Sequence, residues 1–171
     1  MDDIRYPIGK FQPVDLITKE QRDEWIAQVA AGPAALKSAI AGLTPEQLDS
    51  PYREGGWTVK QIAAHLAEND MLVYSRFKHA LTEDNPPIHR AEEAKWAELP
   101  DKTVPIESSV ELFRLVRERW TTLMKGMSDA DFERTFQHPL QGSVPLQRTL
   151  GLYAWHGRHH IAQIEAYQAR L

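Results

Sequence analysis

The chain has 171 residues, 42% of them hydrophobic, and its 24 acidic and 20 basic side chains give a net charge of -4. This length and apolar content predict one domain over residues 1–171, with enough apolar side chains for a buried core. No run of lysine and arginine is long enough to follow a phosphate backbone, so nucleic acid is not an expected partner. Because the chain has no cysteine, a metal ion would be held by histidine or carboxylate side chains.

Membrane and export signals are also missing from the sequence. No apolar run approaches the roughly 20 residues that a membrane-spanning helix needs. The first residues, Met1-Asp2-Asp3-Ile4-Arg5, lack the basic and apolar regions of a signal peptide. We therefore expect a cytoplasmic protein with no membrane partner.

Four stretches have the apolar spacing of long amphipathic helices. They cover residues 18–42, 58–83, 106–127 and 145–171. The first two open with capping-box patterns, Thr18-Lys19-Glu20-Gln21 and Thr58-Val59-Lys60-Gln61, and Pro145 suits the first turn of the fourth. Gly32-Pro33 predicts a bend within the first helix.

The connections between these helices differ in character. Residues 1–17 predict an extended arm, because prolines and a glycine interrupt any helical period. Short helical turns are expected at Thr44–Leu48 and from Ser128, and loops at 50–57 and 136–143. The segment up to Pro105 predicts a long polar connection anchored by Trp96. With no strand-like alternation long enough to predict a sheet, the expected fold is an all-α four-helix bundle.

Histidines cluster near the C-terminus, where three of the seven fall within residues 156–160. On a helix, His156 and His160 point from one face at adjacent turns, so both rings can reach one metal ion. His159 lies about 100° round the helix and is expected in packing, in an interface or behind the ligands. In a bundle, a third ligand from a facing helix is needed, and His65 fits because small apolar residues flank it. Spacing alone also allows three separately hydrogen-bonded histidines.

The remaining histidines are weaker candidates. His79 lies about 21 Å beyond His65 on the same predicted helix and has charged neighbours, which indicates a surface position. His89 falls in the polar connection and His138 in a predicted loop, where surface exposure is the expected state.

Two sequence blocks resemble the signature of the YfiT-like branch of the DinB-like family. The first is Pro51-Tyr52-Arg53-Glu54-Gly55-Gly56-Trp57-Thr58-Val59 followed by His65-Leu66-Ala67, and the second is Tyr153-Ala154-Trp155-His156-Gly157-Arg158-His159-His160. Further similarity extends over nearly the whole chain, including Tyr6-Pro7-Ile8-Gly9 and Trp96-Ala97-Glu98-Leu99-Pro100.

The resemblance implies a four-helix bundle that holds one divalent metal ion, zinc or nickel, through three histidines. These fall on His65, His156 and His160. It further implies a metal-dependent hydrolase, or an S-transferase that uses a low-molecular-weight thiol such as bacillithiol or mycothiol, and a homodimer. The segment Glu68-Asn69-Asp70-Met71-Leu72 departs from the family pattern, which is richer in His and Asn, and is a candidate pocket lining.

Side chains near the predicted ligands suggest how such a site would work. Three neutral imidazoles leave a zinc-like ion with open positions, where water or a thiol would be activated. Glu68 and Asn69 follow His65 closely enough to orient it or to act as a base. The alternative is that Glu68 and Asp70 are a carboxylate pair that faces water at the helix surface.

Other polar and aromatic residues in the two blocks have simpler interpretations. Arg53 and Glu54 fit either a flexible mouth of the site or an ordinary turn salt bridge, and Arg158 suits the outer helix face. Trp57, Trp155 and Tyr153 are expected in the core.

The sequence therefore supports two classes of function. The first is an enzyme in which the three-histidine metal site acts on a small-molecule substrate. The second is a non-catalytic bundle, stabilised by metal or free of it, that works as a binding or dimerisation module. A di-iron bundle is disfavoured because the chain contains no Glu-x-x-His motif.

Overall fold

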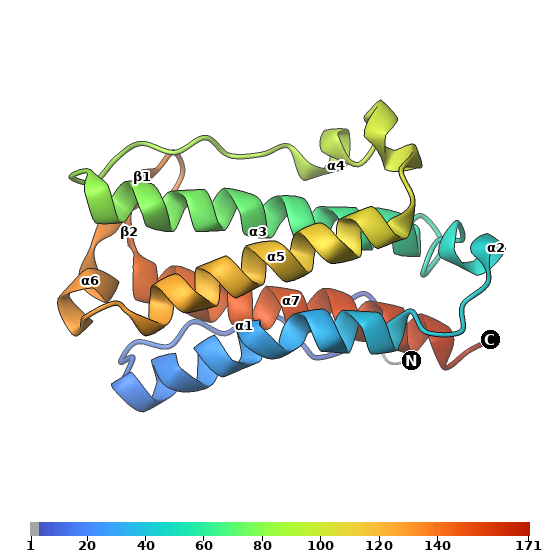
Figure 1. Ribbon diagram of the computed structural model, residues 1–171, viewed down its shortest axis with the longest axis horizontal. Coiled ribbons are helices and arrows are strands. Elements are labelled where there is room, and N and C mark those ends of the chain that lie inside the picture. The colour runs from blue at the N-terminus through green and yellow to red at the C-terminus, as the bar shows by residue number, and fades with distance from the viewer. Residues whose placement is uncertain (1–3) are drawn as a thin grey trace.

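The computed structural model describes residues 4–171, and four long helices form its frame (Figure 1). They are α1 (Lys19–Ala39), α3 (Val59–Thr82), α5 (Ile106–Lys125) and α7 (Leu146–Gln168). The shorter elements are α2 (Pro45–Leu48), α4 (Glu93–Trp96), the 3-10 turn η1 (Pro100–Thr103), α6 (Asp129–Glu133) and the strands β1 (Thr135–His138) and β2 (Gly142–Pro145). The all-α four-helix bundle predicted from the sequence is confirmed, with one small sheet added.

Most helix starts follow the predicted caps. Thr58 and Thr44 each form a complete capping box with the glutamine three residues later. Thr18 caps α1 by accepting from the Gln21 backbone N–H, but the Gln21 side chain bonds Glu24 instead of closing the box.

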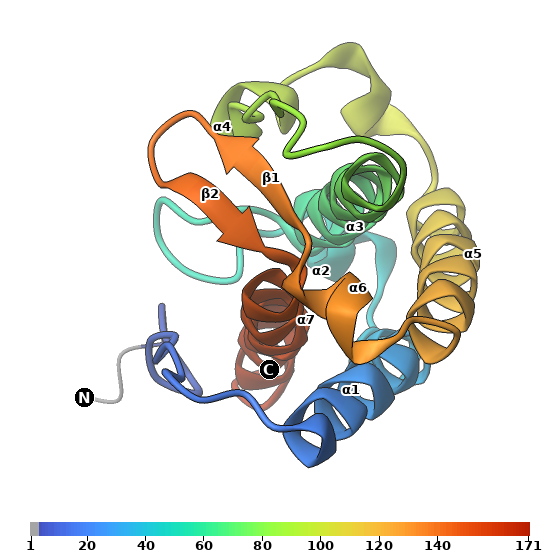
Figure 2. The same ribbon diagram turned by 90° about the vertical axis from the view of Figure 1, so that its left-hand side faces the viewer.

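The order of the helices around the bundle is not sequential. Helix α1 packs against α5 and α7, and α3 packs against the same two, so α1 and α3 lie on one diagonal (Figure 2). Helices α1 and α7 run one way and α3 and α5 the other (Figure 1). Because α3 and α5 are parallel, the chain must return along the full length of α3 between them. This explains the long predicted connection, residues 83–105, which the structure folds into α4 and η1.

The loop expected at residues 136–143 is wrong, since β1 and β2 pair there as an antiparallel hairpin. The register pairs Thr135 with Pro145 and His138 with Gly142, whose positive φ of 73° suits the tight turn. Four-residue strands are too short to show a clear apolar alternation, which is why the sequence did not reveal them.

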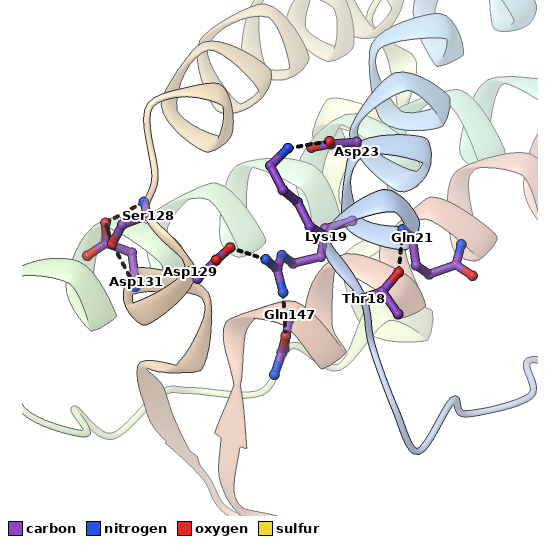
Figure 3. A network of polar contacts seen from close by, with 9 residues as sticks. Thr18, Lys19, Gln21, Asp23, Ser128, Asp129, Asp131 and Gln147 are labelled. Carbon is purple, nitrogen blue, oxygen red and sulfur yellow. Dashed lines mark hydrogen bonds and ion pairs between the residues drawn. The ribbon is translucent and has the colours of Figure 1, made fainter.

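Arg22 ties the start of α1 to neighbouring elements at one end of the bundle, where Figure 3 shows Asp129 and Gln147 beside the first turn of α1. Its guanidinium donates to Gln147 Oε1 at 3.2 Å, at the start of α7, and pairs with Asp129 of α6. The predicted fourth helix ends at Gln168, short of Leu171. Within residues 4–171, no helix is both long and apolar enough to cross a membrane.

The core consists of two apolar clusters separated by a polar layer. In each long helix one residue marks the division: Gly32 in α1, Asp70 in α3, Arg117 in α5 and Gly157 in α7. Arg117 is buried, and its Nε donates to Asp70 Oδ2 at 2.5 Å. Its other contacts reach the remaining two helices.

Helix α1 receives Arg117 through the Gly32-Pro33 pair. Pro33 has no N–H, so the Val29 carbonyl lacks its usual helical partner, and Arg117 Nη1 donates to that oxygen at 3.0 Å. A Cβ on Gly32 would lie 1.8 Å from Arg117 Nη1, and one on Gly157 would lie 2.3 Å from Nη2. The helix continues through Pro33. Gly32 leaves space for the guanidinium, and Pro33 leaves the Val29 carbonyl free to accept its hydrogen bond.

Gly32→Ala is therefore expected to destabilise the protein by about 1–3 kcal/mol through overpacking, although alanine is normally the better helix former. Arg117 cannot move aside without losing Asp70 or the Val29 carbonyl. Gly126→Ala is the matched control, because its new Cβ meets nothing closer than 3.5 Å. Urea unfolding measures the free energy of unfolding of both variants, and equal values would contradict the close contact between Gly32 and Arg117.

Candidate metal centre

The three predicted ligands come together from two helices. His65 projects from α3, while His156 and His160 project from successive turns of α7. One ring nitrogen from each lies within 4.8 Å of the others, and His65 Nε2 is 3.1 Å from His156 Nε2. Nitrogens that bind one tetrahedral ion at about 2.0 Å are roughly 3.3 Å apart, so the trio has nearly the required spacing.

The charge state of these imidazoles also suits metal binding. Burial lowers the pKa of His65 to about 4 and that of His160 to about 3. Burial, followed by the neighbouring His160 and His65, holds the pKa of His156 well below its usual value. All three rings are therefore neutral near pH 7 and offer lone pairs rather than charges.

Gln163 sets the orientation of the His160 ring. Its Nε2 donates to the Arg5 carbonyl at 2.9 Å and to the Tyr52 hydroxyl at 3.1 Å, which leaves Oε1 facing His160. His160 Nδ1 lies 2.8 Å from that oxygen and must carry the proton. The lone pair of Nε2 is then directed at the site, the arrangement common behind metal-binding histidines.

Asn69 occupies the same face of α3 as His65, one turn later. Its Nδ2 is 3.2 Å from His65 Nε2, and its Oδ1 accepts from the Tyr153 hydroxyl at 3.3 Å. Arg76 Nη1 in turn donates to that hydroxyl at 3.4 Å. The hydrogen bonds from Arg76 to Tyr153 and from Tyr153 to Asn69 orient the amide so that its Nδ2 faces His65 Nε2. Asn69 is thus a hydrogen-bond donor here and cannot serve as a base.

The two acidic neighbours of Asn69, Glu68 and Asp70, lie in different surroundings. Glu68 is half-buried beside His65 in a cavity of about 200 Å³, and burial, aided by Asp101, raises the pKa of its carboxyl. The outer wall of this cavity is the 83–105 connection, including Trp96. Asp70 is fully buried against Arg117, so a carboxylate pair facing water is wrong for it.

The other histidines lie outside this trio. His159 is buried, stacks on Trp155 with ring centroids 4.6 Å apart, and has its Nε2 3.1 Å from Gln163 Nε2. His79 is exposed and pairs with Glu83, and His89 is exposed, as expected. His138 is half-buried in a second cavity.

Three further side chains of the two sequence blocks lie near the site or on the helix that carries it. Arg158 is exposed on the outer face of α7, as expected. Arg53 donates to the Glu54 carbonyl and the Tyr52 hydroxyl, and among the described residues it makes no ion pair with the Glu54 carboxylate. Trp57 is only partly buried, and its ring stands 4.7 Å from that of His65 as a wall of the site.

Sequence reasoning missed Tyr153 and Gln163 as parts of the site. Tyr153 precedes His156 by three residues and Gln163 follows His160 by three, so both share the ligand face of α7. That spacing was a usable signal. Another groove, of about 650 Å³ between α1 and α5, contains none of the histidines and is not the site.

Comparison with known proteins gives consistent matches. Residues 28–164 match the DinB superfamily. A relative from Bacillus mycoides, described as a candidate metal-dependent hydrolase, is 47% identical over the whole chain and 99% of its own length. YfiT from Bacillus subtilis, a four-helix bundle of unusual topology with the same description, is 44% identical and covers 98% of this chain and 97% of its own, with a TM-score of 0.94.

A mycothiol-dependent maleylpyruvate isomerase shares the fold at greater distance. It is 17% identical, and the alignment covers 81% of this chain and 60% of the isomerase with a TM-score of 0.61. At this identity the likeness concerns the fold alone.

Gln163→Leu removes the acceptor behind His160, and we expect it to weaken Zn²⁺ binding to the metal-depleted protein about 10–100-fold. Competition with a chelating dye measures this affinity. Gln168→Leu, on the same helix but bonded to the Ala41 carbonyl, is the control and should bind as the wild type does. Unchanged affinity in Gln163→Leu would contradict the orienting role.

Proposed function

The chain belongs to the DinB superfamily, and we propose that it is a metal-dependent hydrolase whose divalent ion, zinc or nickel, is held by His65, His156 and His160. The convergence of three neutral imidazole nitrogens within 4.8 Å carries this proposal. The descriptions of the relatives support the same reaction class.

The donor set fits a catalytic ion better than a structural one. A divalent ion held by three neutral imidazoles keeps its full charge and an open position, and lowers the pKa of the water or thiol that occupies it. Among the described residues, the ligand group has no fourth histidine or carboxylate to close the shell. This favours the enzyme over the non-catalytic bundle.

The side chains around the ligands would divide the remaining work. Asn69 presents N–H groups beside the ligand nitrogens and would stabilise negative charge that develops there. Glu68, with a raised pKa, lines the adjoining cavity and would accept or return a proton. Trp57 shields one side of the His65 and His160 rings from water.

Metal content tests the ligand assignment directly. Protein purified without a histidine tag should contain about one zinc or nickel ion per chain by mass spectrometry, and His156→Ala should lose most of it. The control is His79→Ala, which removes an exposed histidine on α3 and should keep the metal. A His156→Ala protein that retains stoichiometric metal would sink the assignment.

Asn69→Ala should leave the metal content unchanged but lower kcat for p-nitrophenyl acetate by about 100-fold, the usual cost of removing one aligned donor. Ser75→Ala, an exposed change on the same helix, is the control. Tyr153→Phe removes only the hydroxyl that orients the amide and should give a smaller loss.

The same preparation distinguishes hydrolysis from thiol transfer. If metal-dependent turnover occurs only when a low-molecular-weight thiol and monobromobimane are supplied, the reaction is S-transfer and the hydrolase proposal fails. The ligand assignment would stand in that case, because it depends on metal content alone.

A further inference from the structure

A second cavity, of about 290 Å³, lies beside the metal centre and has a strongly positive lining. Its walls come from α3, α7, the β-hairpin, the connection and the N-terminal arm. Three arginines line it, Arg76, Arg90 and Arg148, against a single carboxylate, that of Glu93. Arg90 and Arg148 are exposed and Arg76 is partly buried, and like charges gathered in a concave surface attract a ligand of opposite charge.

The arginines have donors to spare. Among residues 4–171, Arg90 and Arg148 make no hydrogen bond or ion pair with another side chain or with the backbone. Arg76 makes only long bonds, at 3.4 Å to the Tyr153 hydroxyl and 3.5 Å to the His89 carbonyl. Planar guanidinium groups with free N–H pairs match carboxylate and phosphate oxygens in a bidentate fashion.

His138 adds a neutral donor to the same lining. Its Nδ1 accepts from the Leu140 backbone N–H at 3.1 Å, so the ring proton is on Nε2. His138, Arg76 and Arg90 all lie in the lining of this cavity, and burial, followed by the charges of the two arginines, lowers the pKa of His138. Apolar side chains, including Phe136, Val144 and Leu152, complete the walls and would contact a short carbon chain.

The cavity and the metal centre share two helix faces. On α7, Tyr153 and Arg148 precede His156 by about 4.5 and 12 Å along the axis, and Tyr153 lines the cavity while bonding Asn69 at the metal site. Glu93 lines both this cavity and the one that contains His65. One small molecule could therefore contact an arginine and the histidine cluster together.

We propose that this arginine cavity binds an anionic group, a carboxylate or a phosphate, of the substrate on which the metal centre acts. The assignment of this anion to the substrate rests on the proposed function, but the anion site itself depends only on the arginines. This assignment narrows the substrate class to small anionic molecules long enough to reach from an arginine of this cavity to the histidine cluster.

Binding of simple anions tests the cavity without any knowledge of the substrate. Succinate and phenyl phosphate are titrated into metal-depleted protein by NMR, with succinamide as the neutral analogue of succinate. At least one anion should bind, and Arg90→Gln/Arg148→Gln should weaken it at least tenfold. Arg119→Gln, an exposed arginine of α5 outside the cavity, should change the affinity less than twofold. The anion that binds more tightly identifies the group.

Equal affinity in the double variant and the wild type, or equal binding of succinamide and succinate, would overturn the proposal. Circular dichroism confirms that the exposed substitutions leave the fold intact. Metal content of the same variants, measured as they are purified and before metal is removed for the titration, separates the two claims. Arginine-dependent anion binding in a protein that is purified without metal would refute the proposed function alone, whereas a protein that is purified with its metal but shows no arginine-dependent binding would refute the cavity alone.

Discussion

The buried guanidinium of Arg117 is the contact on which the bundle depends, because it reaches all four long helices. From α5 it donates to Asp70 on α3 and to the Val29 carbonyl on α1, and it lies against Gly157 on α7. The Arg117 Cζ atom also lies 4.2 Å from the centroid of the Phe113 ring, which is a cation–π contact. With the Arg117 side chain only 2% exposed and that of Asp70 0%, the pair gains little from water, and loss of either partner would strand a charge.

This polar layer also fixes the level at which the three histidines meet. Asp70 follows Asn69 directly, and Gly157 follows His156, so the residues that hold the helices together adjoin those that face the ligand nitrogens. A shift of α3 against α7 by one turn would break the Arg117 contacts and separate the histidines together. Buried ion pairs rarely add net stability, and here the pair's use is register, since apolar side chains alone would pack in several positions.

The sequence predicted what local patterns encode. Caps and apolar stripes located the four helices, and helical spacing with the apolar flanks of His65 led to the three histidines that the structure brings together. Contacts between residues far apart in the chain could not be predicted from the sequence. Gly32-Pro33 indicated only a bend, because the freed Val29 carbonyl has meaning only once Arg117, 88 residues away, supplies the donor. The parallel direction of α3 and α5 could not be predicted from the sequence either. The homodimer and the cytoplasmic location stay predictions.

The parallel run of α3 and α5 determines which segment covers the two cavities. It forces residues 83–105 back along α3, over the face that carries His65 and Arg76, so the connection becomes the outer wall of both cavities. Glu93, in this connection, stands between them. The helices supply the fixed groups, His65, Asn69 and Tyr153, and the connection supplies the variable wall. Under the proposed function, a change of substrate would then require changes in a surface segment that contributes little to the core, while the histidine cluster and the Arg117 layer stay as they are.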